Sequence, residues 1–184
     1  VIHIGVSNWW FILLHYFNTL SYALIGPILF ILLNSLFTFL DWGSALGLSD
    51  RKRNWGLIYF PVTLVILTIL QYQGLVRPLS TTIGVLVMGY GDGLAALVGA
   101  KWGKREIPFN VSKKSYLGTV TMFAVSLVII TVALCFFSDL SPLRLLLIAL
   151  SVAFISAVVE LLTPFGLDNL TVPLLATLLI EVLV

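Results

Sequence analysis

Long apolar runs constrain this chain more than any other feature of its sequence. Residues 6–40 contain no acidic or basic side chain except His15. Over all 184 residues, 60% are hydrophobic and 10% are charged, and the mean hydropathy is +1.11. A soluble domain carries about 25% charged residues, so this chain has too few to cover a surface that faces water. The composition therefore indicates an integral membrane protein.

The apolar runs are interpreted as helical spans, because strand-like alternation is absent and about 20 apolar residues cross a bilayer as a helix. Residues 6–40 are too many for one helix and predict two short ones, with a break near Gly26-Pro27 or earlier, at Asn18-Thr19. Five further spans are expected at residues 55–70, 79–100, 116–137, 143–162 and 172–184. We therefore predict an all-α, polytopic helical bundle of about seven transmembrane helices, with residues 1–184 forming a single domain.

Positive charge alternates between the loops that join these spans. Loops 41–54 and 101–114 carry three and five Lys or Arg residues, whereas loops 71–78 and 138–142 carry one and none. Because basic loops mark the cytoplasmic side, the two rich loops and loop 163–171 are expected there. The first residues lack the basic segment and cleavage site of a signal peptide. Since no initiator Met is present, we expect the natural chain to begin before Val1.

One carboxylate interrupts a glycine-rich span. Asp92 lies between Gly91 and Gly93 in an otherwise apolar segment. An acid at membrane depth costs roughly 2.5–3.5 kcal/mol unless it is paired, hydrated or bound to a cation, so it marks a candidate functional site. Helix packing is the alternative explanation for the glycines. Gly91, Ala95 and Gly99 recur every four residues, and small residues at this spacing let helices approach closely.

The predicted topology brings further polar residues to the same membrane face. Glu160 ends its span there, and Asp168, Asn169, Lys113 and Lys114 lie in loops on that side. Carboxylates suit Mg²⁺ that also binds substrate phosphates, and lysines neutralise phosphate oxygens. The combination predicts a cytoplasm-facing site for a metal and a polyphosphate. Two alternatives stay open: the basic loop as a topology signal that contacts anionic lipid, and a structural pairing for Glu160.

Several motifs then carry a resemblance to a known family. Residues 91–99 read GDGLAALVG and are followed by Trp102-Gly103-Lys104 and by KKSYLGT at residues 113–119. His3-Ile4-Gly5 and DNLTVP at residues 168–173 add weaker similarity in matching order. The chain thereby resembles the membrane-bound polyprenol kinase family, which includes phytol kinase, dolichol kinase and CTP-dependent diacylglycerol kinase. The closest similarity is to the phytol kinase branch.

The resemblance implies an enzyme that transfers phosphate from CTP to a membrane lipid alcohol, with Mg²⁺ or another divalent metal. The acceptor it favours is an isoprenoid alcohol such as phytol, farnesol or a polyprenol. The implied partners are a nucleoside triphosphate, the lipid alcohol and the membrane, without nucleic acid. The implied roles are Asp92, Glu160 and Asp168 as catalytic residues, Asp92 and Asp168 as metal ligands, Gly91, Gly93, Lys113, Lys114, Ser115 and Asn169 as nucleotide-binding residues, and His3 as part of the amino-terminal motif. Either Glu160 or Asp168 would orient or deprotonate the lipid hydroxyl.

Other functions are alternatives at this point. A CTP-dependent diacylglycerol kinase or a dolichol kinase would differ in the acceptor alone. A phosphatidate cytidylyltransferase-like enzyme would release pyrophosphate instead of CDP. An ion-coupled membrane transporter would use Asp92 as an intramembrane proton or cation site, but such proteins are often built from repeats, and the sequence shows no convincing internal repeat.

Overall fold

The computed structural model describes residues 2–39, 55–108 and 114–184. Over these residues the protein is all-α, as predicted, apart from one isolated β-bridge between Glu106 and Ser115. The elements are α1 (Ile2–Ser7), α2 (Trp9–Tyr16), α3 (Leu20–Ala23), α4 (Ile25–Phe39), α6 (Gly56–Tyr72), α7 (Pro78–Leu86), the π-helical segment η2 (Val87–Asp92), α8 (Gly93–Trp102), α9 (Tyr116–Phe137), α10 (Pro142–Leu162) and α11 (Asp168–Leu183).

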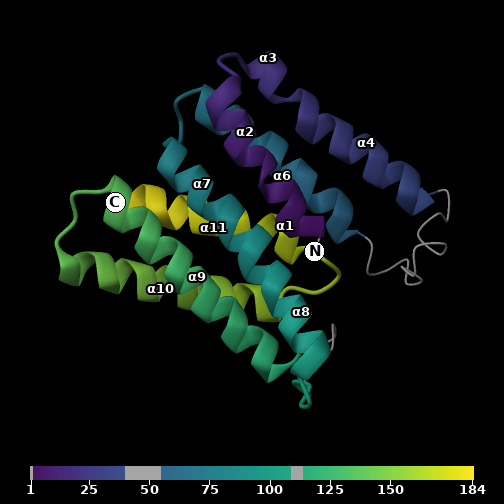
Figure 1. Cartoon of the computed structure of the whole chain (residues 1–184), viewed down its shortest axis with the longest axis vertical. Coiled ribbons are helices and arrows are strands. Elements are labelled where there is room, and N and C mark those ends of the chain that lie inside the picture. Colours follow the sequence, from purple (N-terminus) through teal and green to yellow (C-terminus); the bar gives the residue numbers. More distant parts are fainter. Residues whose placement is uncertain (1, 40–54, 109–113) are drawn as a thin grey trace.

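Two groups of helices pack on either side of a central rod. Helices α9, α10 and α11 lie together, α2, α4 and α6 form the other group, and the rod of α7, η2 and α8 runs between them (Figure 1). The interior is apolar: Trp10, Leu64, Met88, Ile130 and Ala153 are fully buried. The burial of such apolar side chains holds the helices together.

Three of the described helices are long and apolar enough to cross a membrane. They are Pro78–Trp102, which includes η2, Tyr116–Phe137 and Pro142–Leu162. Large apolar side chains such as Val128 and Phe154, each 62% exposed, point outward from these helices. The spans predicted at 79–100, 116–137 and 143–162 are therefore confirmed as apolar helices, and the three together indicate a multi-pass membrane protein. The total of about seven transmembrane helices stays a prediction.

The first apolar run breaks at one of the two predicted places. Helix α2 ends at Tyr16, and α3 begins at Leu20 after the non-helical residues 17–19. Near Gly26-Pro27, the other predicted place, only the single residue Leu24 separates α3 from α4, and Gly26 and Pro27 themselves lie in the first turn of α4. A proline is tolerated there, since the first N–H groups of a helix have no intrahelical acceptor.

The last helix begins earlier than predicted. It starts at Asp168 instead of residue 172 and includes Pro173. Asp168 and Asn169 therefore lie in the first helical turn and not in a loop, which corrects the predicted boundary. This turn places Asp168 beside the carboxyl end of α10 and Asn169 against the start of α6.

Candidate active site

Three carboxylates from three elements meet at one end of the helix bundle. Asp92 ends η2, Glu160 lies in the last turn of α10, and Asp168 begins α11. One carboxylate oxygen from each residue lies within 4.8 Å of the others. Glu160 and Asp168 are buried, with 5% and 6% of their surface exposed, whereas Asp92 is partly exposed. The structure thus brings together the three acids that the topology predicted at one face.

Lys114 bridges two of these acids. Its Nζ lies 2.7 Å from Oε1 of Glu160 and 2.7 Å from Oδ2 of Asp168, and it also donates to the backbone carbonyl of Glu160. Burial alone would lower the pKa of the Lys114 ammonium, but the Asp168 and Glu160 carboxylates outweigh this effect and raise the pKa. The lysine is therefore held in its charged form inside the cluster.

Backbone pairing between residues 105–107 and 114–116 positions Lys114 at the cluster. The Ile107 N–H donates to the Lys114 carbonyl at 2.9 Å, and the Tyr116 N–H donates to the Arg105 carbonyl at 3.3 Å. Ser115, the next residue, caps α9 because its Oγ accepts from the Gly118 N–H at 3.1 Å. Its hydroxyl is thereby engaged in holding the start of α9, and its nucleotide-binding role stays a prediction. The predicted nucleotide-binding Lys113 lies outside the described residues.

The glycines beside Asp92 face other helices. A Cβ at Gly91 would lie 2.8 Å from Met122 Sδ of α9, and one at Gly93 would lie 2.8 Å from Ile4 Cγ1 of α1. Close helix packing therefore accounts for glycine at both positions. A role of Gly91 and Gly93 in nucleotide binding stays a prediction. These glycines flank the end of η2, and π-helical turns of this kind often occur at functional sites.

His3 belongs to the short helix α1 that packs against η2. Its imidazole meets the Phe60 ring edge-on, with the ring centroids 5.4 Å apart. Burial lowers the pKa of this imidazole, while the nearby Asp168 carboxylate acts in the opposite direction. His3 thus lies in the electrostatic neighbourhood of the acid cluster as a neutral group.

The second residue of α11 connects the cluster to α6. The backbone N–H of Asn169 and its Nδ2 both donate to Asp168 Oδ1, at 3.0 and 3.1 Å. Sequence reasoning missed the two α6 residues that hold Asn169. Thr63 Oγ1 donates to the Asn169 carbonyl at 2.9 Å, and Gly56 lies directly against the Asn169 amide. Pro173 could have indicated that such a donor is needed. Proline has no N–H, so the Asn169 carbonyl four residues earlier must find a hydrogen-bond donor outside its own helix.

The residues of the cluster fit a divalent cation. Three carboxylates with one ammonium leave an excess of negative charge when all are ionised. Glu160 Oε2 is buried and has no hydrogen-bond partner among the residues that the structure describes. Such an unpartnered buried oxygen is costly unless a ligand satisfies it, and carboxylate oxygens are the ligands that Mg²⁺ prefers. Asp92 and Asp168 are therefore the residues that would hold a metal, and Glu160 Oε2 beside them is left for a further ligand.

Fold and site together define a class: a helical membrane protein with a buried, lysine-bridged acid cluster at one end of its bundle. No protein-family model matches the chain, and no solved structure matches it. The chain is 36% identical over 126 residues to phytol kinase of Synechocystis sp., which covers 68% of this chain and 53% of that protein. It is 36% identical over 104 residues to phytol kinase 1, chloroplastic, of Arabidopsis thaliana, covering 53% of this chain and 34% of that protein. A probable phytol kinase 2, chloroplastic, of Glycine max is 32% identical over 127 residues, which is 62% of this chain and 42% of the relative.

The chain therefore belongs with the phytol kinase homologues of the polyprenol kinase family, as its motifs predicted. The aligned region spans about half the length of the Synechocystis relative and less of the two plant relatives.

Proposed function

We propose that this protein is a CTP-dependent kinase that phosphorylates the hydroxyl of a membrane isoprenoid alcohol, with phytol as the first candidate, at a cytoplasm-facing Mg²⁺ site. The observation that carries the proposal is the lysine-bridged cluster of Asp92, Glu160 and Asp168, in a chain similar to phytol kinases. Phosphoryl transfer requires mainly positioning and charge stabilisation, and the cluster has the groups for both.

The acids and the lysine have complementary tasks in this proposal. A divalent cation held by Asp92 and Asp168, with Glu160 beside them, would neutralise the charge of the nucleotide phosphates. The ammonium of Lys114 stabilises charge on the oxygens of the transferred group, and Lys113 is proposed to act on the same phosphates. Because the Asp168 and Glu160 carboxylates raise its pKa, Lys114 enters the reaction as an ammonium.

The hydrogen bonds favour Glu160 over Asp168 as the group that receives the proton of the lipid hydroxyl. Both oxygens of Asp168 are engaged, Oδ1 by Asn169 and Oδ2 by Lys114. Glu160 keeps Oε2 without a partner among the described residues. In the proposed step, Glu160 takes the hydroxyl proton, the alcohol oxygen bonds to the γ-phosphorus, and the bond from that phosphorus to the bridging oxygen breaks. The products are the lipid phosphate and CDP.

The test is an assay of the purified protein with γ-labelled CTP and phytol in detergent micelles. We expect labelled phytyl phosphate and an equal amount of CDP, whereas pyrophosphate release would contradict a kinase and favour a cytidylyltransferase. A panel with dolichol and diacylglycerol identifies the acceptor.

Asp92→Asn is expected to abolish transfer, because it removes a carboxylate from the metal-binding cluster. Initial rates are compared with those of Asp139→Asn, a matched substitution of an exposed acid in the turn between α9 and α10. Circular dichroism confirms that both variants are folded. A fully active Asp92→Asn enzyme would refute the assigned metal site.

A further inference from the structure

The carboxylate of Asp168 is held from both sides. Its Oδ1 accepts from the Asn169 backbone N–H at 3.0 Å and from Asn169 Nδ2 at 3.1 Å. Its Oδ2 accepts from Lys114 Nζ at 2.7 Å. Since Asn169 supplies two of these three hydrogen bonds, it determines how the carboxylate is turned at the start of α11.

The side chain of Asn169 is itself locked in place. Nδ2 also donates to the Gly166 carbonyl at 3.0 Å, and the residue is only 4% exposed. Gly166 has a φ of +79°, a conformation that favours glycine, so this loop residue is suited to present its carbonyl here. On the other side, a Cβ at Gly56 would lie 2.6 Å from Nδ2. The first residue of α6 thus packs against the Asn169 amide so closely that only glycine fits there.

The backbone of the same residue is anchored to α6 as well. Pro173 has no N–H and leaves the Asn169 carbonyl without its helical donor. Thr63 of α6 lies with its hydroxyl 2.9 Å from this carbonyl and 3.0 Å from the Tyr59 carbonyl of its own helix, so its one hydrogen is shared between the two acceptors. Helix α6 therefore meets Asn169 at two points: Gly56 lies close to the side-chain amide, and Thr63 lies at hydrogen-bond distance from the backbone carbonyl.

The donors of Asn169 leave none for a phosphate. An amide nitrogen carries two hydrogens, and in Asn169 they serve the Gly166 carbonyl and Asp168 Oδ1. The remaining Oδ1 is a buried acceptor, which cannot donate to a phosphate oxygen. Lys114 differs from Asn169 because it is charged: its three hydrogens also serve Glu160 and Asp168, and it can act on phosphates only through that charge.

We propose that Asn169 is a positioning residue that orients Asp168 for a divalent cation, and that Gly56 permits this by leaving room for the amide. The proposal rests on the proposed function, because it concerns the same metal site. Residues that orient a metal ligand typically change metal affinity when they are replaced. A nucleotide ligand would instead change the KM for the nucleotide.

The experiment compares Asn169→Leu, of similar size but without donors, with the wild-type protein. Mn²⁺ binding to the nucleotide-free protein is measured by electron paramagnetic resonance, and the KM for CTP is measured at saturating metal. We expect Mn²⁺ affinity to fall about 10- to 100-fold, with a nearly unchanged KM for CTP and with recovery of activity at high metal concentration. A raised KM with wild-type Mn²⁺ affinity would overturn the proposal, as would no change in either.

Gly56→Ala provides the second variant, which disturbs the amide from α6 without altering Asn169. It is expected to weaken Mn²⁺ binding in the same direction. Gly5→Ala is the matched control, because a Cβ at Gly5 meets nothing within 4 Å, and it should bind Mn²⁺ as the wild type does. If the wild-type protein neither binds Mn²⁺ nor phosphorylates a lipid alcohol, the proposed function fails. If the wild type does both and the two variants are unaffected, only the role of Asn169 fails.

Discussion

At the scale of single residues, Lys114 supplies the positive charge that compensates the buried carboxylates of Glu160 and Asp168. Its ammonium lies 2.7 Å from both Glu160 and Asp168. Removing one partner of a buried ion pair leaves an uncompensated charge and typically costs about 3–5 kcal/mol. We therefore expect Lys114→Met to lower the free energy of unfolding by about this amount, measured by chemical denaturation in detergent. Lys101→Met is the control, because Lys101 is exposed and its ammonium lies over the Trp102 ring. A loss below about 1 kcal/mol would show that the pair behaves as a surface pair.

The same residue predicts a pH dependence. The pKa of Lys114 is raised above its ordinary value of 10.5 in the folded protein. A base with a raised folded-state pKa stabilises the fold below its ordinary value, and this contribution is lost as the pH rises through the folded-state pKa. The difference in stability between the wild type and Lys114→Met should therefore persist at neutral pH and shrink only above pH 10.5. Denaturation curves measured from about pH 7 to about pH 11 test this, and a difference that disappears by about pH 9 would contradict it.

At the scale of helices, two internal prolines create binding points for a neighbouring helix. Pro61 leaves the Leu57 carbonyl without its helical donor, and Asn34 Nδ2 of α4 donates to it at 2.8 Å. Pro173 does the same for Asn169, whose carbonyl accepts from Thr63. In both cases a proline in one helix is matched by a polar side chain on the helix beside it. The register between two helices is thus set at a particular carbonyl.

A double-mutant cycle tests this relation for α4 and α6. Asn34→Leu removes the donor and should destabilise the protein by about 1 kcal/mol, as measured by thermal denaturation in detergent. In a Pro61→Ala background the same change should cost less, because an alanine at this position restores an N–H for the Leu57 carbonyl. Equal costs in the two backgrounds would mean that the hydrogen bond of Asn34 does not depend on Pro61, since independent sites are additive.

The sequence predicted the type of element better than its local detail. Apolar length alone located the helices at Pro78–Trp102, Tyr116–Phe137 and Pro142–Leu162. The π-helical turn before Asp92 was not predicted, because one extra residue in a turn leaves no clear mark on the hydrophobic pattern. The start of α11 was placed too late, because its first polar residues read as loop although they face the interior. These details depend on contacts with other helices, which a single segment does not encode.

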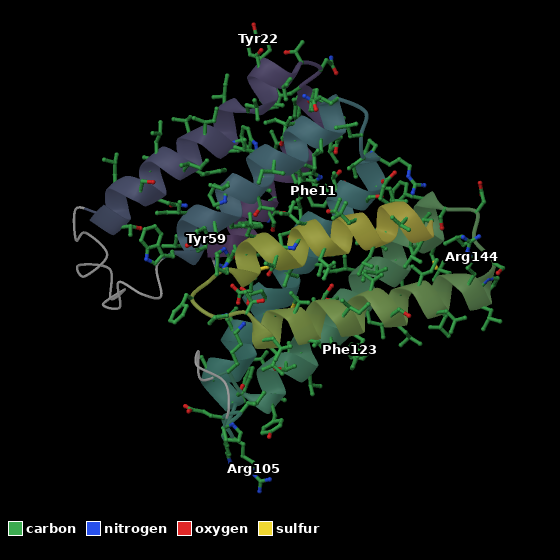
Figure 2. All side chains as sticks on the ribbon, turned by 180° about the vertical axis from the view of Figure 1, so that it is seen from behind. Phe11, Tyr22, Tyr59, Arg105, Phe123 and Arg144 are labelled. Atoms are coloured by element: carbon green, nitrogen blue, oxygen red, sulfur yellow. The ribbon has the colours of Figure 1, made fainter. Side chains whose placement is uncertain are left out.

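At the scale of the whole molecule, charge is divided between the two ends of the bundle. Arg105 points away from the bundle beyond α8, and Arg144 lies at the opposite end of α10 (Figure 2). At that opposite end, Arg77 Nε pairs with Glu181 Oε1 at 3.0 Å, and Arg144 donates to the Leu183 carbonyl at 2.9 Å. The sequence predicted that the acids converge at one face, because charged loops fix a topology. It did not predict that Lys114 would join two of them, because this depends on how residues 105–107 pair with residues 114–116.

The predicted orientation implies that an impermeant reagent outside the membrane reaches one end of α9 and not the other. If α9 crosses the membrane once, Lys104 before it and Asp139 after it lie on opposite sides, with Lys104 in the cytoplasm, because basic loops are retained there. Single cysteines at these positions, in a Cys135→Ser background, can be labelled in sealed, right-side-out vesicles with an impermeant maleimide. We expect Asp139→Cys to react at once and Lys104→Cys to react only after the membrane is permeabilised. Reaction of both in sealed vesicles would refute a single crossing by α9, and the reverse pattern would place the acid cluster on the outer face, where cytosolic CTP could not reach it.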